Sequence, residues 1–492
     1  MSSTKELESS SENGTAAHVL PEDDSELQKK AVRKLDYTIL PVMTMFYLLS
    51  FLDRANIGNA RIAGLQKSLH LTDHQYQICV TVLYVPYIAA ELPSNLLLRT
   101  VGPRLLMPTL LTLWGIIVTL QGLVTSYGGL IAVRTLLGMV EGPMFPGIVL
   151  YLSSFYTREE LSLRIAFFFS SASLSGAFSG LLAAAIQNMD GVGGKPGWSW
   201  IFILEGLFSI LMGITGFFLV PSTPRDSKFL TDNQKDIIMR RLEKDRPSIV
   251  PSDRFSIREV LWSLRSPHVL LLFVLFFMVG TTLYGLALFL PSIVNQLGFS
   301  PVKSQLLSVG PFAVGFFVTL LSAYVSDRYK SRAIPSAVIA SLSVIGFAIY
   351  LSTKDKFTAY GSLFLTVPGV YASAPTLSAW MANNSEPYYR RATSIALGFV
   401  ATNAGGILST WRFPTKEGPR FRNTTIMDLT FSALVVVGSI VNALLLSHMN
   451  RSKKLRRDTL LAPYTVDEKN PDGGVKAWME LGDRHPDFTY TL

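Results

Sequence analysis

Long apolar segments recur along this chain about every 30 residues, and each is close to the roughly 20 residues that an α-helix needs to cross a bilayer. Short polar stretches separate them. This pattern predicts an all-α integral membrane protein with twelve transmembrane helices. The segments are 36–60, 76–98, 104–125, 129–155, 164–187, 199–221, 268–295, 305–326, 333–352, 358–382, 391–411 and 426–448.

The longest polar interruption, 222–266, divides these segments into two groups of six. Two pseudo-symmetric six-helix halves joined by a basic loop are typical of transporters built from parallel repeats. The predicted parts are a cytoplasmic N-terminal tail (1–35), a first six-helix half (36–221), a cytoplasmic central loop (222–266), a second six-helix half (267–449) and a cytoplasmic C-terminal tail (450–492).

Small residues at four-residue spacing form a ridge in the fifth segment and a second ridge in the eleventh, which is its equivalent by the repeat. Such ridges let helices approach closely in lipid. We therefore interpret them as packing surfaces in preference to substrate contacts. The residues are Ala172, Gly176 and Gly180 in the first ridge, and Ser394, Gly398, Thr402 and Gly406 in the second.

The composition agrees with a membrane location. Mean hydropathy is +0.34 and 16% of the residues are charged, whereas soluble domains have about 25%. The formal net charge of +9 arises from Lys and Arg that concentrate in alternate loops and in the C-terminal tail. By the positive-inside rule, we expect both termini and the central loop to lie in the cytoplasm. The positive charge therefore indicates a protein embedded in the lipid bilayer and not one that binds nucleic acid. One loop, with Arg412, Lys416, Arg420 and Arg422, is an exception because it falls on the predicted outer side.

Few residues suit metal or covalent chemistry. Cys79 is the only cysteine, so an internal disulfide or a multi-thiolate metal site is excluded. The six histidines are scattered, and His70 and His74 lie in a polar outer loop where solvated surface is the simpler interpretation. No nucleotide-binding loop or nucleophile triad is present. We expect no enzyme activity, no catalytic or metal site, and no cofactor.

Two opposite charges, Asp53 and Arg54, end the first apolar segment. An ionisable side chain at membrane depth costs about 2.5–3.5 kcal/mol on insertion scales, so it needs a functional or structural reason. Adjacent residues are about 100° apart around a helix, so the two side chains cannot face the same way. One can face a cavity while the other faces a neighbouring helix.

The fourth segment carries a second pair of charges, Arg134 and Glu141. Both share one helix face with Gly138, and they lie about 10 Å apart along the axis. Gly138 leaves room for another helix or a water-filled crevice, and Gly142 and Pro143 interrupt the helix beside Glu141.

These charges have a purely structural alternative. Arg134 and Glu141, or Asp53 and Arg134, would then be buried ion pairs that only hold helices together. We favour a central cavity for substrate and proton, because intramembrane charges usually mark such pathways.

The loop after the eighth segment contains Asp327, Arg328 and Arg332, and residues 323–332 resemble the Gly-x-x-x-Asp-Arg-x-x-Gly-Arg loop of the major facilitator superfamily. Both glycines of that motif are replaced here. The resemblance implies that these three residues act as a gating latch.

Longer matches narrow the resemblance to the anion:cation symporters of this superfamily and, within them, to the fungal allantoate permease family. They cover essentially everything from residue 34 onward. The resemblance implies the major facilitator fold, a monomer in the plasma membrane, and proton-coupled uptake of a small organic anion by alternating access. The matching stretches are 52–60, 84–95, 141–146, 197–206 and 482–490.

The resemblance also implies roles for the charged residues. Arg54 matches the arginine that grips the substrate carboxylate, and a guanidinium suits a planar carboxylate. Asp53 and Glu141 match the acids that take up and release the coupling proton. Arg134 matches the arginine that neutralises Glu141 in one state of the cycle, and Tyr87 matches a tyrosine that hydrogen-bonds substrate.

Further candidates for the substrate site come from the second half. Thr402 or Asn403 falls where related carriers place a polar ligand, and Tyr284 is expected to line the site from the seventh segment. Trp380 is expected to cap the cavity, with an interfacial membrane anchor as its alternative. Ala172 stands where the sugar-acid carriers have a glutamine, which argues against a polyhydroxylated substrate.

Two other observations concern residues outside that site. Asn423 belongs to a sequon in a predicted outer loop and is the credible glycosylation site. Glu91 and Glu205 also lie in or near the apolar segments. We interpret Glu91 as the partner of a loop arginine, and Glu205 as part of a structural motif.

Two rival functions use the same fold. One is a nutrient sensor that binds a solute without moving it, although the short predicted tails count against it. The other is efflux of a metabolite by proton antiport, although residues 170–176 contain no proline and so lack the usual Gly-Pro motif of the fifth segment.

Overall fold

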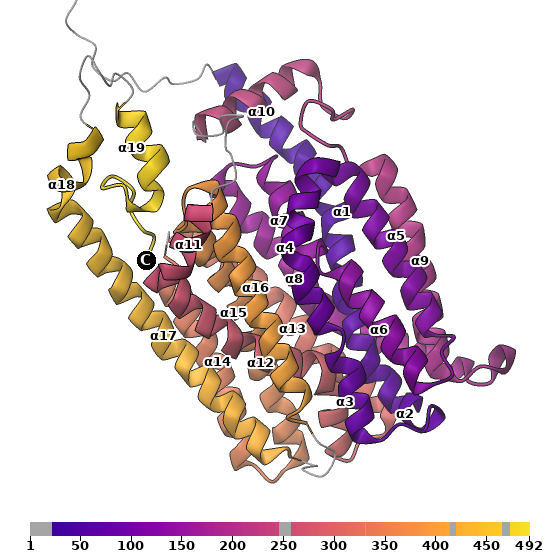
Figure 1. Ribbon diagram of the computed structural model, residues 1–492. Helices are drawn as coiled ribbons and strands as arrows, with labels where there is room; N and C mark the ends of the chain where they lie inside the picture. Colours follow the sequence, from indigo (N-terminus) through magenta and orange to yellow (C-terminus); the bar gives the residue numbers. More distant parts are fainter. Residues whose placement is uncertain (1–21, 246–256, 330, 414–419, 465–472) are drawn as a thin grey trace, which may run out of the picture.

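The computed structural model describes residues 22–245, 257–329, 331–413, 420–464 and 473–492, and the regular structure of these residues is helical throughout. Figure 1 shows two helical bundles side by side, one built from the first part of the chain and the other from the second. The predicted all-α membrane fold is confirmed. Parts of the predicted tails and central loop (1–21, 246–256 and 465–472) lie outside the described residues.

The helices follow the predicted segments. The first bundle contains α1 (Glu22–Ile62), α2 (Leu65–Ser68), α3 (Asp73–Thr81), α4 (Tyr84–Val101), α5 (Pro103–Gln121), α6 (Tyr127–Glu141), α7 (Met144–Ser153), α8 (Arg158–Ile186) and α9 (Gly197–Leu219). Between the bundles lie α10 (Asp232–Asp245) and α11 (Ile257–Arg265). The second bundle contains α12 (Pro267–Gln296), α13 (Pro301–Arg328), α14 (Ala333–Ser352), α15 (Lys356–Asn383), α16 (Tyr388–Thr410) and α17 (Arg422–Leu455), followed by α18 (Arg457–Leu461) and α19 (Gly473–Leu481).

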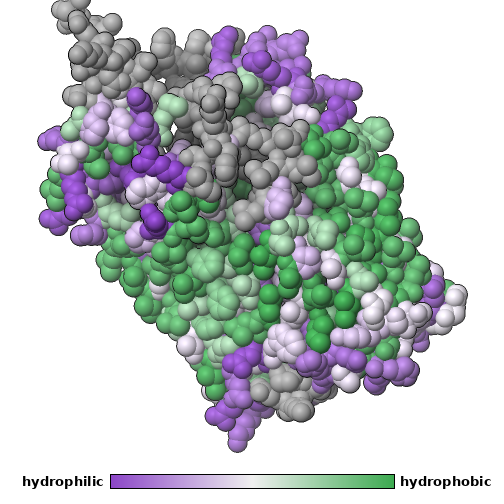
Figure 2. Space-filling view, viewed as in Figure 1, coloured by the Kyte–Doolittle hydropathy of each residue, from purple (hydrophilic) through white to green (hydrophobic). Residues whose placement is uncertain are grey.

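Within the described ranges, nine helices are long and apolar enough to cross a membrane: α1, α5, α8, α9, α12, α13, α14, α16 and α17. The other three predicted segments correspond to the broken pair α3 and α4, the broken pair α6 and α7, and α15, which contains Pro368 and Pro375. In Figure 2 apolar residues form a broad band between two polar ends. Large apolar side chains such as Phe218 and Phe317 are exposed, as expected for a surface that contacts lipid.

The two broken helix pairs pack against each other at their breaks. A Cβ atom on Gly138 would lie 2.1 Å from the Leu83 carbonyl oxygen, and one on Gly142 would lie 2.5 Å from the Tyr87 carbonyl oxygen. The absence of side chains at Gly138 and Gly142 therefore lets α6 approach the backbone of α4. The contact fixes Tyr87 and Glu141 at the same level of the bundle.

Glycines of both predicted small-residue ridges form close packing contacts. A Cβ atom on Gly176 of α8 would lie 2.8 Å from the Phe312 ring of α13, and one on Gly406 of α16 would lie 2.8 Å from the Tyr84 ring of α4. Both contacts join the first bundle to the second. In addition, Gly58 of α1 lies against the Leu288 carbonyl of α12.

α1 begins at Glu22, well before the predicted start at residue 36. Its early turns are held by partners distant in sequence: Arg164 of α8 forms two hydrogen bonds to Asp36 at 2.7 and 2.9 Å, and Lys34 donates to Gln234 at 3.1 Å. Gln234 belongs to α10, which lies within the predicted central loop. Figure 1 places the start of α1, α10 and α19 at one end of the molecule.

The C-terminal segment 473–492 binds the same end of the second bundle. Trp380 of α15 donates its indole N–H to the Thr491 carbonyl at 2.9 Å, and Asn384 exchanges two hydrogen bonds with Thr491. Lys453 of α17 donates to the Phe488 carbonyl at 2.6 Å, and Arg390 of α16 forms an ion pair with Asp483. The segment therefore ties together the ends of α15, α16 and α17.

The contact between α4 and α6 makes a prediction about Gly138. Replacement Gly138→Ala forces the Leu83 backbone away, and we expect the free energy of unfolding to fall by about 1–3 kcal/mol, as in other overpacked sites. The measurement is the midpoint of thermal unfolding in detergent. Gly128→Ala in the same helix is the control, because nothing lies within 4 Å of the added Cβ atom. Equal midpoints for both variants would contradict the role of Gly138.

Candidate functional site

Arg54 of α1 is almost completely buried, with 5% of its surface exposed. Its Nε–H donates to Oε1 of Glu141, and its Nη1–H donates to the hydroxyl of Tyr284. The guanidinium carbon also lies over the Tyr87 ring, 4.6 Å from its centroid. Residues from α1, α4, α6 and α12 therefore converge on one cation.

Hydrogen bonds extend from this cation in both directions. Ser50, one turn before Arg54 on α1, donates to Glu141 Oε1 at 3.1 Å. On the other side the Tyr284 hydroxyl donates to Asn403 Oδ1 at 3.1 Å, and Asn403 Nδ2 donates to the Phe399 carbonyl at 2.9 Å. The chain of bonds crosses from the first bundle to the second. It makes Arg54 a link between the two halves.

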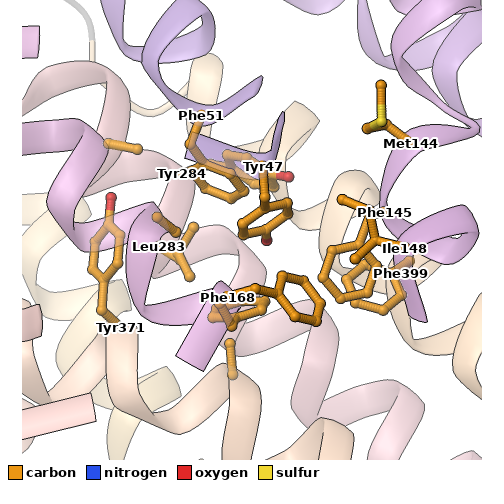
Figure 3. Packing of buried hydrophobic residues seen from close by; sticks show 14 of the residues in the cluster. Tyr47, Phe51, Met144, Phe145, Ile148, Phe168, Leu283, Tyr284, Tyr371 and Phe399 are labelled. Atoms are coloured by element: carbon orange, nitrogen blue, oxygen red, sulfur yellow. The ribbon is translucent and has the colours of Figure 1, made fainter. Parts of the chain in front are cut away.

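The cavity at Arg54 is small and aromatic. Its volume is about 20 Å³, enough for roughly one water molecule. Phe145 of α7 and Phe399 of α16 close one side, with ring centroids 3.9 Å apart (Figure 3). The lining residues are Tyr47, Ser50, Phe51, Arg54, Tyr87, Phe145, Phe169, Leu283, Tyr284, Phe399 and Thr402. A larger ligand must separate these side chains in order to enter.

A second, larger cavity lies next to α2, at the end of the molecule opposite to α10 (Figure 1). Its volume is about 730 Å³, and its lining includes Arg61, Asp73 and Asn295. Phe289 and Phe413, whose rings stack with centroids 4.6 Å apart, also line it. A Cβ atom on Gly285, next to Tyr284 in the chain, would lie 3.0 Å from the Phe413 ring, so this stack packs against the helix that carries Tyr284.

Asp53 and Arg134 lie close to Arg54 but outside its hydrogen-bond chain. Both are buried, and in the described part of the protein neither Asp53 oxygen has a hydrogen-bond partner. The Nε and Nη2 atoms of Arg134 also lack one. Among the same residues Glu141 forms its salt bridge with Arg54 and none with Arg134. The structural alternatives, Arg134–Glu141 and Asp53–Arg134 salt bridges, are therefore not formed in this conformation.

The structure brings together several of the residues predicted for substrate binding. Arg54, Tyr87, Tyr284 and Thr402 line the small cavity, and Asn403 bonds to Tyr284. Trp380 is buried against the C-terminal segment and does not line that cavity.

Two of the three predicted latch residues, Asp327 and Arg332, interact with each other. Arg332 forms a salt bridge with Asp327 at 2.6 Å and donates to Ser326 Oγ at 2.7 Å. Arg328 is exposed at the end of α13. Asn423, the predicted glycosylation site, is exposed in the first turn of α17.

Sequence reasoning missed Ser50 and the aromatic lining. Ser50 is one turn from Arg54 on α1, so helix spacing was a usable signal for it. Phe145, Phe169 and Phe399 carried no comparable signal, because aromatic residues in apolar segments are most often core residues.

Comparison with known proteins decides the family. The family model described as Major Facilitator Superfamily matches residues 43–410. The chain belongs to the Major Facilitator Superfamily. It is therefore a multi-pass membrane transporter and not an enzyme.

Curated relatives in this superfamily come from fungi. The high-affinity nicotinic acid transporter of Saccharomyces cerevisiae is 32% identical over 477 residues, which cover 96% of this chain and 86% of the relative. The MFS-type transporter efuF of Hormonema carpetanum is 32% identical over 433 residues, 87% of each chain. The major facilitator-type transporter hxnP of Emericella nidulans is 28% identical over 476 residues, 95% of this chain and 94% of the relative.

Solved structures support the fold. The proton:xylose symporter XylE matches with a TM-score of 0.68 at 14% identity, over 82% of this chain and 95% of that one. A bacterial homologue of the human lysosomal transporter Spinster, in an inward-facing and unoccupied conformation, matches with a TM-score of 0.62 at 15% identity, over 85% and 97%. At these identities the likeness concerns the fold alone.

The hydrogen bonds of Tyr284 make a prediction about the link between the halves. Tyr284→Phe leaves the Nη1–H of Arg54 without its partner, and we expect the free energy of unfolding to fall by about 1–3 kcal/mol. Thermal unfolding of the purified protein in detergent measures this change. Tyr371→Phe is the control, since Tyr371 is a buried tyrosine outside the Arg54 chain of bonds. A larger loss of stability in Tyr371→Phe than in Tyr284→Phe would contradict the prediction.

Proposed function

We propose that this transporter is a proton-coupled uptake carrier for a small organic anion, a monocarboxylate, vitamin or ureide such as nicotinate or allantoate. The observation that carries the proposal is the buried salt bridge between Arg54 and Glu141 at the junction of the two halves. The resemblance to the fungal allantoate permease family, in the anion:cation symporter group, supports the same substrate class.

The surroundings of Arg54 suit a carboxylate attached to a flat, compact group. A guanidinium recognises a carboxylate through two parallel hydrogen bonds. The rings of Phe51, Tyr87 and Tyr284 surround that cation and offer stacking surfaces. The name of the Saccharomyces cerevisiae relative, a nicotinic acid transporter, agrees with such a substrate.

Competition for Arg54 provides the coupling. Glu141 already occupies the position on Arg54 that a substrate carboxylate would take. Displacing an ionised Glu141 would leave a buried charge without its partner, which costs about 3–5 kcal/mol. Protonation of Glu141 removes this cost. The anion therefore binds together with a proton, and either one alone binds poorly.

The same competition explains alternating access. Without substrate, Arg54 holds Glu141 in the first half and Tyr284 in the second, and the site is closed. Bound anion and proton break the Arg54–Glu141 bond and release this arrangement. When Glu141 loses its proton on the inner side, its bond with Arg54 forms again and the anion is expelled. The nearby charges of Asp53 and Arg134 help to balance the charge of the site during this step.

We further propose that the carrier works as a monomer in the plasma membrane with both tails in the cytoplasm. Basic residues support this orientation, because Arg390 and Lys453 lie at the end that holds α10 and α19. The cavity of about 730 Å³ at the other end would then be the entry from outside.

Uptake by a transporter-deficient yeast tests the substrate assignment. We expect radiolabelled nicotinate, allantoate, pantothenate or biotin to accumulate faster at acidic than at neutral pH. Arg54→Lys should raise KM roughly 10- to 100-fold, because it replaces a charge-assisted two-point contact with a single one. Arg54→Ala should abolish uptake. Lys354→Ala, which removes an exposed cation outside both cavities, is the control. Normal uptake by Arg54→Ala would overturn the proposed role of Arg54.

Glu141→Gln tests the coupling. The amide cannot form the salt bridge with Arg54, so the anion should bind without a proton. We expect accumulation driven by the pH gradient to be lost, whereas exchange of labelled for unlabelled substrate persists and no longer depends on pH. Normal gradient-driven accumulation by Glu141→Gln would show that another group couples the proton.

A further inference from the structure

A second unpaired acidic residue of the first bundle is Glu205 of α9. It is buried, with 5% of its surface exposed, and neither of its carboxyl oxygens has a partner among the described residues. Asp53 is in the same condition. An unpaired buried carboxylate is expensive in a membrane interior, so two of them near each other need an explanation.

Close helix contacts bring these two carboxyl groups to the same region. A Cβ atom on Gly216 of α9 would lie 2.7 Å from the Phe46 ring of α1, which marks where the two helices meet. Asp53 lies two turns beyond Phe46, and Glu205 lies three turns before Gly216. Because the helices run in opposite directions, a rise of 1.5 Å per residue leaves the two Cα atoms offset by about 6 Å along the axis. A glutamate side chain spans such an offset.

The third helix around this pair is α5. It touches α9 where a Cβ atom on Gly206 would lie 2.7 Å from the Gly115 carbonyl oxygen. The neighbouring Trp114 is fully buried, and its uncharged indole group interacts with the carboxyl group of Asp53. α5 therefore supplies no charge to the pair. Its glycine contact fixes the position of Glu205.

The charged groups around the pair are few. Among the described residues, Glu205 interacts electrostatically with Asp53, and Asp53 interacts with Glu205, Glu141 and Arg134. Of the two arginines described near the pair, Arg54 is held by Glu141, whereas Arg134 forms no salt bridge. One cation can balance one carboxylate, so Asp53 and Glu205 cannot both be ionised without a large cost.

We propose that Asp53 and Glu205 form a proton-holding pair that exchanges the coupling proton with Glu141. The step breaks the O–H bond of a protonated Glu141 and forms an O–H bond on the pair, so it moves one proton between carboxyl groups and needs no other reactant. Neither Asp53 nor Glu205 lines the substrate cavity at Arg54. The proton therefore leaves by a route that the bound anion does not block. This inference rests on the proposed function, since it assigns the proton pathway of that carrier.

The test compares Glu205→Gln with Ser209→Ala in liposomes that contain the purified protein. Ser209 is one turn along α9 from Glu205, is fully buried and also lacks a hydrogen-bond partner, so its variant controls for packing changes in this region. Three quantities are measured: substrate exchange, substrate accumulation driven by a pH gradient, and proton uptake that follows addition of substrate.

We expect Glu205→Gln to exchange substrate at the wild-type rate but to lose proton uptake. Its accumulation ratio should fall by about tenfold for each unit of the applied pH gradient and each coupled proton lost. Ser209→Ala should retain all three activities. A purely structural Glu205 would instead lower exchange and accumulation together, and that outcome overturns the proposal.

A second variant keeps the test decisive if Glu205→Gln does not fold. Glu205→Asp retains a titratable carboxyl group, and we expect it to retain proton uptake with an altered pH dependence. Loss of exchange and proton uptake together in Glu205→Asp would again indicate a structural role. Wild-type protein that accumulates substrate without proton uptake would refute the proposed function and this inference with it. Full coupling in Glu205→Gln would refute the inference alone.

Discussion

The salt bridge between Arg54 and Glu141 joins two charged side chains that are both almost completely buried. Removing two charges from water costs several kcal/mol per ion, and their attraction repays that cost only with good geometry and further hydrogen bonds. The surrounding residues meet this condition: Ser50 donates to Glu141, and Tyr284 accepts from Arg54. Since Tyr284 belongs to the second half, the stability of the charge pair depends on closure of the two halves. In this site, neutralisation of the two charges therefore depends on how the helices of the two halves pack.

Much of the fold follows from segment length and apolar character alone, because a helix must satisfy its own backbone in lipid. Gly142 and Pro143 also marked the break between α6 and α7 correctly. The early start of α1 could not be predicted in this way. Its first turns are polar, and the partners that hold Asp36 and Lys34 lie more than 120 residues away in sequence. Local patterns carry no information about such pairs.

The charged residues within the apolar segments allowed the site to be predicted, because charged side chains are rare in the membrane interior. Their partners were not predictable. Helix spacing put Arg134 and Glu141 on one face, yet Glu141 bonds to an arginine of another helix. The position of Trp380 has a similar explanation, because its partner belongs to a segment 111 residues further along the chain. The aromatic lining was hidden because phenylalanine in an apolar segment looks the same in a core and in a cavity.

The C-terminal segment has a mechanical consequence. Its described hydrogen bonds reach Arg332, Asn384, Arg390 and Lys453, all in the second half. A half whose helix ends are cross-linked in this way resists internal bending. The first half instead contains two interrupted helix pairs, α3 with α4 and α6 with α7. The two halves are therefore unequal in stiffness despite their similar architecture. Deformation during transport should concentrate in the first half, while the second moves as a rigid body.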